Sequence, residues 1–161
     1  MTEIHPHIFI GTDQECINTN SPDWATIHAC KNPCHASAVG YRGSLPSTHP
    51  NYLILENSEH LYLNMVDMNN ELMPKFTNPI MKSAFAFIDK HIAERKLLIH
   101  CNQGLSRSPS IALLYLARKG EVANDLYSSA KNDFLKRYPI FNPGRGIELY
   151  MINNWQDINH M

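Results

Sequence analysis

The segment Lys96–His100, Lys-Leu-Leu-Ile-His, constrains the fold of this chain more than any other. Its three central residues are all apolar, so we expect a short strand that is covered on both faces. One helical pattern precedes this segment and another follows it closely. A buried strand between two helices is typical of α/β domains, in which helices pack on a mostly parallel sheet.

The two flanking helices are predicted from their apolar spacing and their ends. In the first helix, apolar residues recur at steps of three and four: Met81, Ala84, Phe85, Ile88 and Ile92. We expect it to begin with Asn78 as its N-cap and Pro79 in the first helical position. The second helix is predicted over Pro109–Lys119, with Gly120 in a capping position at its C-terminal end.

The remaining elements follow from shorter patterns. Strands are predicted over Ile8–Ile10, Trp24–Ala29, Tyr52–Glu56 and Leu61–Val66. Loops are predicted over Lys31–Pro50 and Asp67–Pro74, and two further helices over Val122–Phe134 and Ile147–Ile158. The chain is therefore predicted to be α/β, with a central, mostly parallel sheet of about five strands flanked by helices. Its 161 residues fit one domain, 1–161.

Composition excludes several classes of function. The formal net charge is −1, which gives no basic balance for nucleic acid, and no apolar run approaches the roughly 18 to 20 residues of a membrane helix. No secretion signal opens the sequence, so we expect a cytoplasmic protein that binds neither nucleic acid nor membrane. Its four cysteines, Cys16, Cys30, Cys34 and Cys101, are then expected to be reduced thiols. The sequence leaves the oligomeric state open.

The segment from Cys101 to Ser108 carries the chemistry. It joins a buried strand to a helix N-terminus, an arrangement that favours anion binding. If the loop curls, the backbone N–H groups of Asn102–Arg107 can surround an oxyanion, and Gly104 has no Cβ to obstruct that curl. The guanidinium of Arg107 matches two phosphate oxygens. The same features favour the thiolate form of Cys101, a nucleophile that can attack a bound phosphate and form a phosphocysteine.

These residues resemble a known family. His100-Cys101, five residues and Arg107-Ser108 is similar to the signature of the protein tyrosine phosphatases, and Gly104 and Ser106 make it most similar to the dual-specificity branch. The resemblance extends to four further segments: Pro6–Gly11, Phe87–Asp89, Ser110–Leu116 and Pro139–Gly144. It is weakest over Lys31–Pro50. The alternative, an ordinary strand-to-helix turn that holds a buried cysteine, does not account for this combination.

The resemblance implies a role for each site residue. Cys101 is the nucleophile, and Arg107 binds the phosphate together with the loop residues Asn102, Gln103, Gly104, Leu105 and Ser106. Asp67 is the general acid, with Glu71 as a nearby rival and a turn cap as the structural alternative. Ser108 stabilises the leaving thiolate, or caps the following helix. His100 orients the loop, and Asn142 is a weaker candidate for contact with the site.

No metal and no cofactor are predicted. The cluster His28, Cys30, Cys34 and His35 invites a zinc site, but its spacing is not that of common zinc fingers and no second ligand pair follows, so unligated side chains are favoured. A further hypothesis is that Cys30 or Cys34 forms a reversible disulfide with Cys101 under oxidation.

The expected substrate is a phosphorylated protein. Asn102 and Gln103 are uncharged, whereas relatives that act on highly phosphorylated lipids usually carry lysines there. RNA-directed relatives tend to have Asn-Arg-Thr in place of Ser106-Arg107-Ser108. We therefore expect hydrolysis of phosphotyrosine, with phosphoserine and phosphothreonine as further candidates. The alternatives are a phosphate-dependent binding module without turnover and a rhodanese-like sulfur carrier. Arg107 argues against the sulfur carrier.

Overall fold

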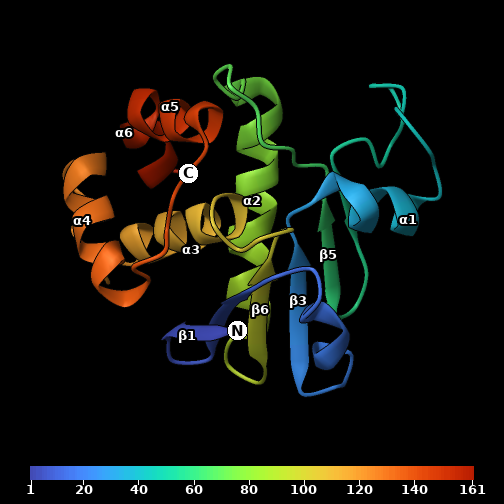
Figure 1. The fold of residues 1–161 in the computed structure, drawn as a ribbon, viewed down its shortest axis with the longest axis horizontal. Helices are drawn as coiled ribbons and strands as arrows, with labels where there is room; N and C mark the ends of the chain where they lie inside the picture. Colours follow the sequence, from blue (N-terminus) through green and yellow to red (C-terminus); the bar gives the residue numbers. More distant parts are fainter.

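A single mixed sheet organises the computed structural model, which describes residues 1–161 (Figure 1). Its strand order is β1-β2-β6-β3-β5-β4. The strands are β1 (Thr2–His5), β2 (Ile8–Gly11), β3 (Trp24–His28), β4 (Ile54–Glu56), β5 (His60–Leu63) and β6 (Lys96–His100). The inner strands β2, β6, β3 and β5 are parallel, and the edge strands β1 and β4 pair antiparallel. The predicted fold class is thus confirmed, with one more strand than expected.

The central strand β6 explains the apolar run at Lys96–His100. Leu97, Leu98 and Ile99 are fully buried, because helices cover one face of the sheet and η1 (Cys16–Thr19) contacts the other. β6 pairs with β2 and β3 along its whole length. This register sets Gly11 and His28 level with His100, so Cys101 follows at the carboxyl edge of the sheet, where parallel α/β sheets place their ligands.

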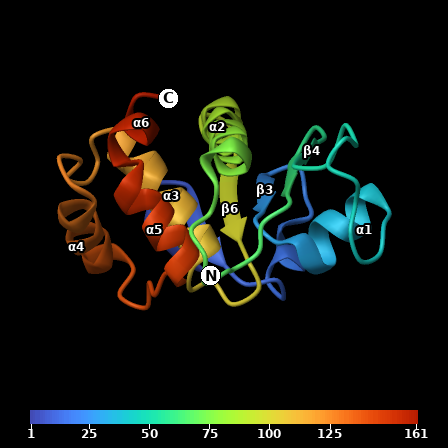
Figure 2. The same cartoon turned by 90° about the horizontal axis from the view of Figure 1, so that it is seen from above.

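Six helices complete the fold. They are α1 (Ala36–Val39), α2 (Pro74–His91), α3 (Arg107–Arg118), α4 (Tyr127–Arg137), α5 (Arg145–Asn153) and α6 (Trp155–Asn159), with a short helical turn η2 (Lys31–His35) before α1. α3 to α6 gather at one end of the sheet and α1 lies at the other, as Figures 1 and 2 show. α2 and α3 contact β6, and 37 buried apolar residues form one continuous core.

The start of α2 differs from the prediction. The helix begins at Pro74, so Pro79 lies inside it rather than in its first position. Asn78 does not cap a helix end: its side-chain oxygen accepts a hydrogen bond from the Tyr150 hydroxyl at 2.6 Å. Burial of Thr77 and Ile80 on the core side stabilises the extra helical turn. This packing outweighs the local cost of the proline.

Three other helix predictions were also wrong. α4 begins at Tyr127 rather than at Val122. α3 begins at Arg107, two residues before the expected start at Pro109, so the arginine is itself helical. The last predicted helix is broken at Asn154 into α5 and α6. Trp155, the first residue of α6, is buried and donates a hydrogen bond to the Asn124 carbonyl at 2.9 Å.

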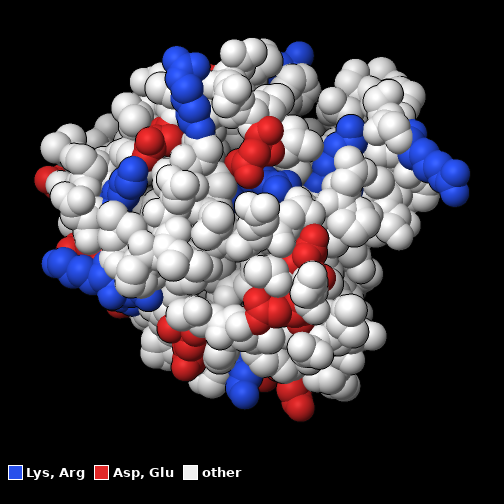
Figure 3. Space-filling view, viewed as in Figure 1, with Lys and Arg blue, Asp and Glu red and all other residues white.

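The surface carries charges of both signs. On the face drawn in Figure 3, Lys and Arg side chains are interspersed with Asp and Glu, and no broad area of one sign stands out. No helix combines the length and the apolar character that crossing a bilayer requires. Both observations agree with a net charge near zero.

We expect Pro79→Ala to stabilise the protein. An alanine restores an N–H that can bond to the carbonyl four residues earlier, at Lys75, and should raise the free energy of unfolding by about 1–3 kcal/mol. Pro74→Ala is the matched control, because the first helical position has no such bond and the change there should be small. Urea unfolding measures both, and equal effects would contradict this account of α2.

Candidate active site

The sequence motif forms a short loop between β6 and α3. Cys101 is the first residue after β6 and is 2% exposed, and Arg107 is the first residue of α3. A pocket of about 410 Å³ opens above Cys101. Its lining comprises Asp67, Cys101, Asn102, Gln103, Leu105, Ser106, Arg107, Asn142 and Gly144. The fold therefore brings Asp67 from another loop to the residues of the motif.

The backbone of the loop offers a set of free donors. None of the N–H groups from Asn102 to Ser106 donates a hydrogen bond to another group of the chain. Its carbonyls, in contrast, are held from outside: the Tyr138 hydroxyl donates to Gly104 O at 2.7 Å and the Asn142 N–H to Leu105 O at 2.8 Å. Successive free N–H groups before a helix N-terminus are suited to an anion.

Gly104 is required by this loop for two reasons. Its φ of +72° lies in the left-handed region, and a Cβ there would come within 3.0 Å of the Gly11 carbonyl oxygen. The sharp curl and the close approach to β2 both depend on the missing side chain. The sequence prediction for Gly104 is consistent with this geometry.

Arg107 presents an unused donor at the pocket. Its Nη1 donates to Met65 O at 3.0 Å and its Nη2 to Asn102 Oδ1 at 2.7 Å, so the side chain is held rigidly and is only 8% exposed. Its Nε is buried and has no hydrogen-bond partner, although Asp67 Oδ2 lies 3.3 Å away, within ion-pair distance. Buried donors without a partner are rare, and a bound oxyanion would satisfy this one.

The side-chain amide of Asn102 is fully engaged in hydrogen bonds that hold neighbouring segments together. Its Nδ2 donates to Asp13 Oδ2 and to the Asn32 carbonyl, both at 3.0 Å, while its Oδ1 accepts from Arg107. One amide thereby connects three segments that are distant in sequence. Sequence reasoning missed Asp13, because a single acid in a polar turn carries no pattern.

Ser108 lies directly against Cys101. Its Oγ is 3.2 Å from Cys101 Sγ, and the residue is fully buried. Because α3 begins at Arg107, Ser108 is not the helix N-cap. The hydroxyl is therefore free to donate to the sulfur when the sulfur is a thiolate.

Asp67 is held at the rim by the loop itself. Its Oδ1 accepts a hydrogen bond from Ser106 Oγ at 2.8 Å, and that hydroxyl accepts one from the Gly144 N–H at 2.8 Å. The rival Glu71 is half-buried outside the pocket lining, and its carboxylate accepts a hydrogen bond from the Asn153 side chain. Asp67 is the carboxylate that lines the pocket.

The loop that carries Asp67 is anchored on α5 through Gly146. The Gly146 N–H donates to Met68 O at 2.8 Å, and the Leu72 N–H donates to Gly146 O at 3.1 Å. A Cβ on Gly146 would lie 2.2 Å from Asn70 O and 2.4 Å from Met68 O, far inside contact distance. The position of Asp67 therefore depends on a glycine that the sequence did not single out.

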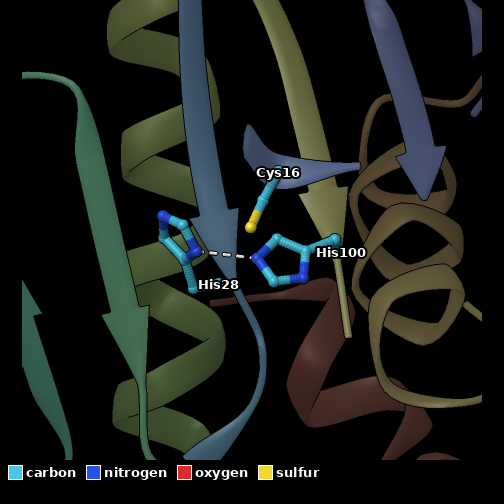
Figure 4. A group of neighbouring side chains, drawn as sticks. All are labelled: Cys16, His28 and His100. Atoms are coloured by element: carbon cyan, nitrogen blue, oxygen red, sulfur yellow. Dashed lines mark hydrogen bonds between the residues drawn. The ribbon is translucent and has the colours of Figure 1, made fainter. Parts of the chain in front are cut away.

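His100 ends a chain of three hydrogen-bonded imidazoles. Its Nδ1 lies 3.2 Å from Cys101 O and its Nε2 lies 2.7 Å from His28 Nδ1, while His28 Nε2 lies 3.0 Å from His60 Nδ1. A carbonyl can only accept, so His100 donates from Nδ1 and accepts from His28 at Nε2. The same logic makes His60 the donor to His28. Figure 4 shows His28 and His100 facing each other from the ends of β3 and β6.

Burial keeps these imidazoles neutral. Burial, with the neighbouring imidazoles of His100 and His60, lowers the pKa of His28 to about 2. Burial also lowers the pKa of His100 and of the half-buried His60. A neutral His100 that donates to the Cys101 carbonyl fixes the start of the loop, as the resemblance implied.

The cysteine and histidine cluster differs from the one that the sequence suggested. His35 is turned away, because its ring nitrogens bond to the Tyr41 hydroxyl at 2.7 Å and to Asn51 O at 2.9 Å. Cys34 Sγ instead lies 4.0 Å from His100 Nε2. All four cysteines are free thiols.

The known proteins whose sequences are similar to this chain include phosphatases. No protein-family model matches the chain. A dual specificity protein phosphatase YVH1 of Plasmodium falciparum is 34% identical over 99 residues, which cover 60% of this chain and 16% of that protein. The tyrosine-protein phosphatase vhp-1 of Caenorhabditis elegans is 25% identical over 126 residues, or 78% of this chain and 17% of that protein. The chain thus matches about one sixth of the length of either relative.

Solved structures show the same architecture at low sequence identity. A human tyrosine phosphatase-like serine/threonine/tyrosine-interacting protein superposes with a TM-score of 0.63 at 19% identity, covering 99% of this chain and 95% of that one. The structure of DUSP15 gives a TM-score of 0.62 at 18% identity, with 99% and 92% covered. This chain has the dual-specificity phosphatase fold. The first relative agrees with the resemblance of the motif to the dual-specificity branch over 60% of the chain, and the solved structures show that the fold extends over nearly the whole chain.

Loss of His28 should change how stability depends on pH. The pKa of His28 in the folded phosphatase-like domain lies below its unfolded value, so between about pH 6.5 and pH 2 only the unfolded state binds this proton. The contribution of neutral His28 is complete above pH 6.5 and is lost as the pH falls. Between pH 6 and pH 4, the free energy of unfolding should therefore fall more steeply in the wild type than in His28→Gln, by up to about 1.4 kcal/mol per pH unit.

Urea unfolding at several pH values measures this difference in slope. His160→Gln is the control, because His160 is exposed and its loss should leave the slope unchanged. Equal slopes in the wild type and His28→Gln would show that His28 takes up its proton in the folded state.

Proposed function

We propose that this protein is a cysteine-dependent phosphatase that hydrolyses phosphate monoesters on proteins. The observation that carries the proposal is that one pocket is lined by Cys101, by four loop residues with free backbone N–H groups and by Arg107, whose Nε has no hydrogen-bond partner. A tetrahedral phosphate dianion supplies acceptor oxygens for the backbone N–H groups and for Arg107 Nε. The placement of Asp67 at the rim adds a proton donor on the open side.

In the first step, the thiolate of Cys101 attacks phosphorus on the side opposite the leaving oxygen. The S–P bond forms as the P–O bond to the substrate breaks, and protonated Asp67 gives its proton to the leaving oxygen. Arg107 and the loop N–H groups hold the other phosphate oxygens, on which negative charge is spread during transfer. The first product is the dephosphorylated substrate, and the phosphoryl group stays on sulfur.

In the second step, water attacks the phosphocysteine and Asp67, now a carboxylate, accepts a proton from it. The S–P bond breaks and the electron pair returns to sulfur. The Ser108 hydroxyl, 3.2 Å from Cys101 Sγ, stabilises this leaving thiolate by donating a hydrogen bond. Inorganic phosphate is released, and the enzyme returns to its starting form without a metal or a cofactor.

Phosphorylated protein segments are the proposed substrates, with phosphotyrosine as the first candidate and phosphoserine and phosphothreonine as further ones. The support is chemical: Asn102 and Gln103 place no extra cation at the pocket for further phosphate groups. A largely apolar groove also lies beside the Asp67 loop, lined in part by Tyr52, Met65 and Phe76. Such a groove suits the apolar side chains that flank a phosphorylated residue in a peptide.

Hydrolysis of an aryl phosphate from pH 4 to 9, in the presence of a chelator, tests the proposal. We expect the wild type to turn over and Cys101→Ser to show no activity above background. Asp67→Asn should lower kcat by roughly 10²–10⁴-fold, with a flattened basic limb because its amide cannot ionise.

Each other outcome of this test has a definite meaning. Activity in Cys101→Ser would contradict the proposal outright. A wild type that binds vanadate without turnover would instead indicate a phosphate-dependent binding module, and transfer of sulfur instead of release of phosphate would indicate a rhodanese-like carrier. The half-buried thiols at Cys16 and Cys34 agree with a reducing compartment such as the cytoplasm, which we propose as the site of action.

Gly146→Ala should impair catalysis from a distance. Its Cβ would press on Asn70 O and Met68 O and displace the loop that carries Asp67. Because misplacing a catalytic group by about 1 Å can cost 10²-fold in rate, we expect kcat to fall roughly 10- to 100-fold. Vanadate binding should fall much less than kcat, since the Cys101 loop is affected only through the contacts of Asp67 with Ser106 and Arg107. Parallel losses of kcat and vanadate affinity would mean that the effect is global, and thermal unfolding of the variant would check this.

A further inference from the structure

A second cluster of reactive side chains lies behind the Cys101 loop, outside the machinery proposed above. Cys16 Sγ, one ring nitrogen of His28 and one of His100 all lie within 4.8 Å of one another. The thiols of Cys30 and Cys34 form an equally tight group with His100. Figure 4 shows the Cys16 thiol pointing into the space between the two imidazoles. The two groups share His100, so the Cys30 and Cys34 thiols lie next to the group formed by Cys16, His28 and His100.

The structure brings these donors together from four separate segments. His28 and His100 end the paired strands β3 and β6, Cys16 opens η1, and Cys34 lies in η2. His28, Cys30 and His100 are buried, and Cys16 and Cys34 are half-buried on the solvent side. The cluster is thus closed on the side of the sheet and accessible through its two half-buried thiols.

We propose that this cluster is a binding site for one Zn²⁺ ion, with Cys16, Cys34, His28 and His100 as its ligands. Two thiolates and two imidazoles are a preferred ligand set of structural zinc, whereas Mg²⁺ and Ca²⁺ require oxygen donors. Cys16, His28 and His100 already form one group, and Cys34, whose Sγ is 4.0 Å from His100 Nε2, is the thiol that would move toward Cys16 and His28 to complete the set. The proposal does not depend on the phosphatase activity.

The observed distances are close to those of such a site. Zn–S and Zn–N bonds of about 2.3 and 2.0–2.1 Å place ligand atoms of a tetrahedral ion roughly 3.3–3.8 Å apart. His28 Nδ1 and His100 Nε2, now 2.7 Å apart, would have to separate slightly, and Cys34 Sγ would have to approach from 4.0 Å. Both changes are within the reach of small side-chain rotations.

The outer hydrogen bond of His100 already fits zinc binding, and that of His28 fits after a change of tautomer. Ligating histidines usually donate their second ring N–H to an acceptor that orients the ring. His100 does so to Cys101 O, and His28 Nε2 faces His60 Nδ1. On binding zinc, His28 would move its proton from Nδ1 to Nε2 and donate to His60, whose own proton would move from Nδ1 to Nε2. The two thiols would lose theirs to solvent, so Zn²⁺ would exchange for two protons and the buried site would stay neutral.

Titration of the reduced, metal-free full-length chain with Co²⁺, followed by Zn²⁺, tests the site. We expect one Co²⁺ per chain with intense thiolate-to-cobalt charge-transfer absorption, which Zn²⁺ abolishes. Because loss of even an outer partner costs about 10–100-fold in metal affinity, Cys16→Ser should weaken Zn²⁺ binding by at least about 100-fold. Cys101→Ser is the matched control and should bind like the wild type, since the catalytic thiol is not a proposed ligand.

Two further measurements separate ligand loss from misfolding. Without metal, Cys16→Ser and Cys16→Ala should unfold at nearly the wild-type temperature, and Zn²⁺ should raise only the wild-type midpoint. Calorimetry in buffers of different ionisation enthalpy should detect about two protons released per Zn²⁺. Absence of charge-transfer absorption in the wild type would overturn the proposal. Loss of binding in Cys101→Ser with retention in Cys16→Ser would equally overturn it, because the ion would then sit on the nucleophile.

Discussion

The parallel pairing of β6 between β2 and β3 is the constraint on which the rest of this structure depends. It buries the Leu97–Ile99 run and aligns Gly11, His28 and His100 at one edge of the sheet. The loop that follows can then curl closely against Gly11. On its other side, His100 is supported by its hydrogen bond with the His28 imidazole. A shift of register by one residue would turn His100 to the opposite face and remove both supports.

Around this edge, the pocket is rigid because its supports come from outside it. Tyr138, Asn142 and Met65 hold the loop carbonyls and the arginine, while the donors that face a ligand stay free. Such preorganisation is what transition-state stabilisation requires, since no donor has to be reoriented when the charge develops. Asp67 belongs to the same system through Ser106, so the acid and the anion cradle are positioned by one hydrogen bond.

Sequence reasoning succeeded where a local pattern carried the information. The apolar strand, the glycine-containing loop and the helix after it are contiguous, so their arrangement around Cys101 could be predicted. It failed where distant segments compete with local preference. Pro79 suggests a helix start, but packing of Thr77 and Ile80 extends α2 back to Pro74. β1 was missed because Ile4 is its one buried residue and no alternation results. Tertiary contacts place Cys16 in the cysteine and histidine cluster and hold His35 outside it, and the spacing of these residues in the sequence indicates neither.

The ion pair between Arg107 and Asp67 has a consequence for how a ligand finds the pocket. With the carboxylate 3.3 Å from the guanidinium, the two charges largely cancel at a distance, and the chain as a whole carries a formal charge of −1. Little long-range field remains to draw anions in, so encounter should proceed at an ordinary diffusive rate that ionic strength barely alters. Discrimination then begins only at contact, which suits the proposed action on a phosphate carried by a larger molecule.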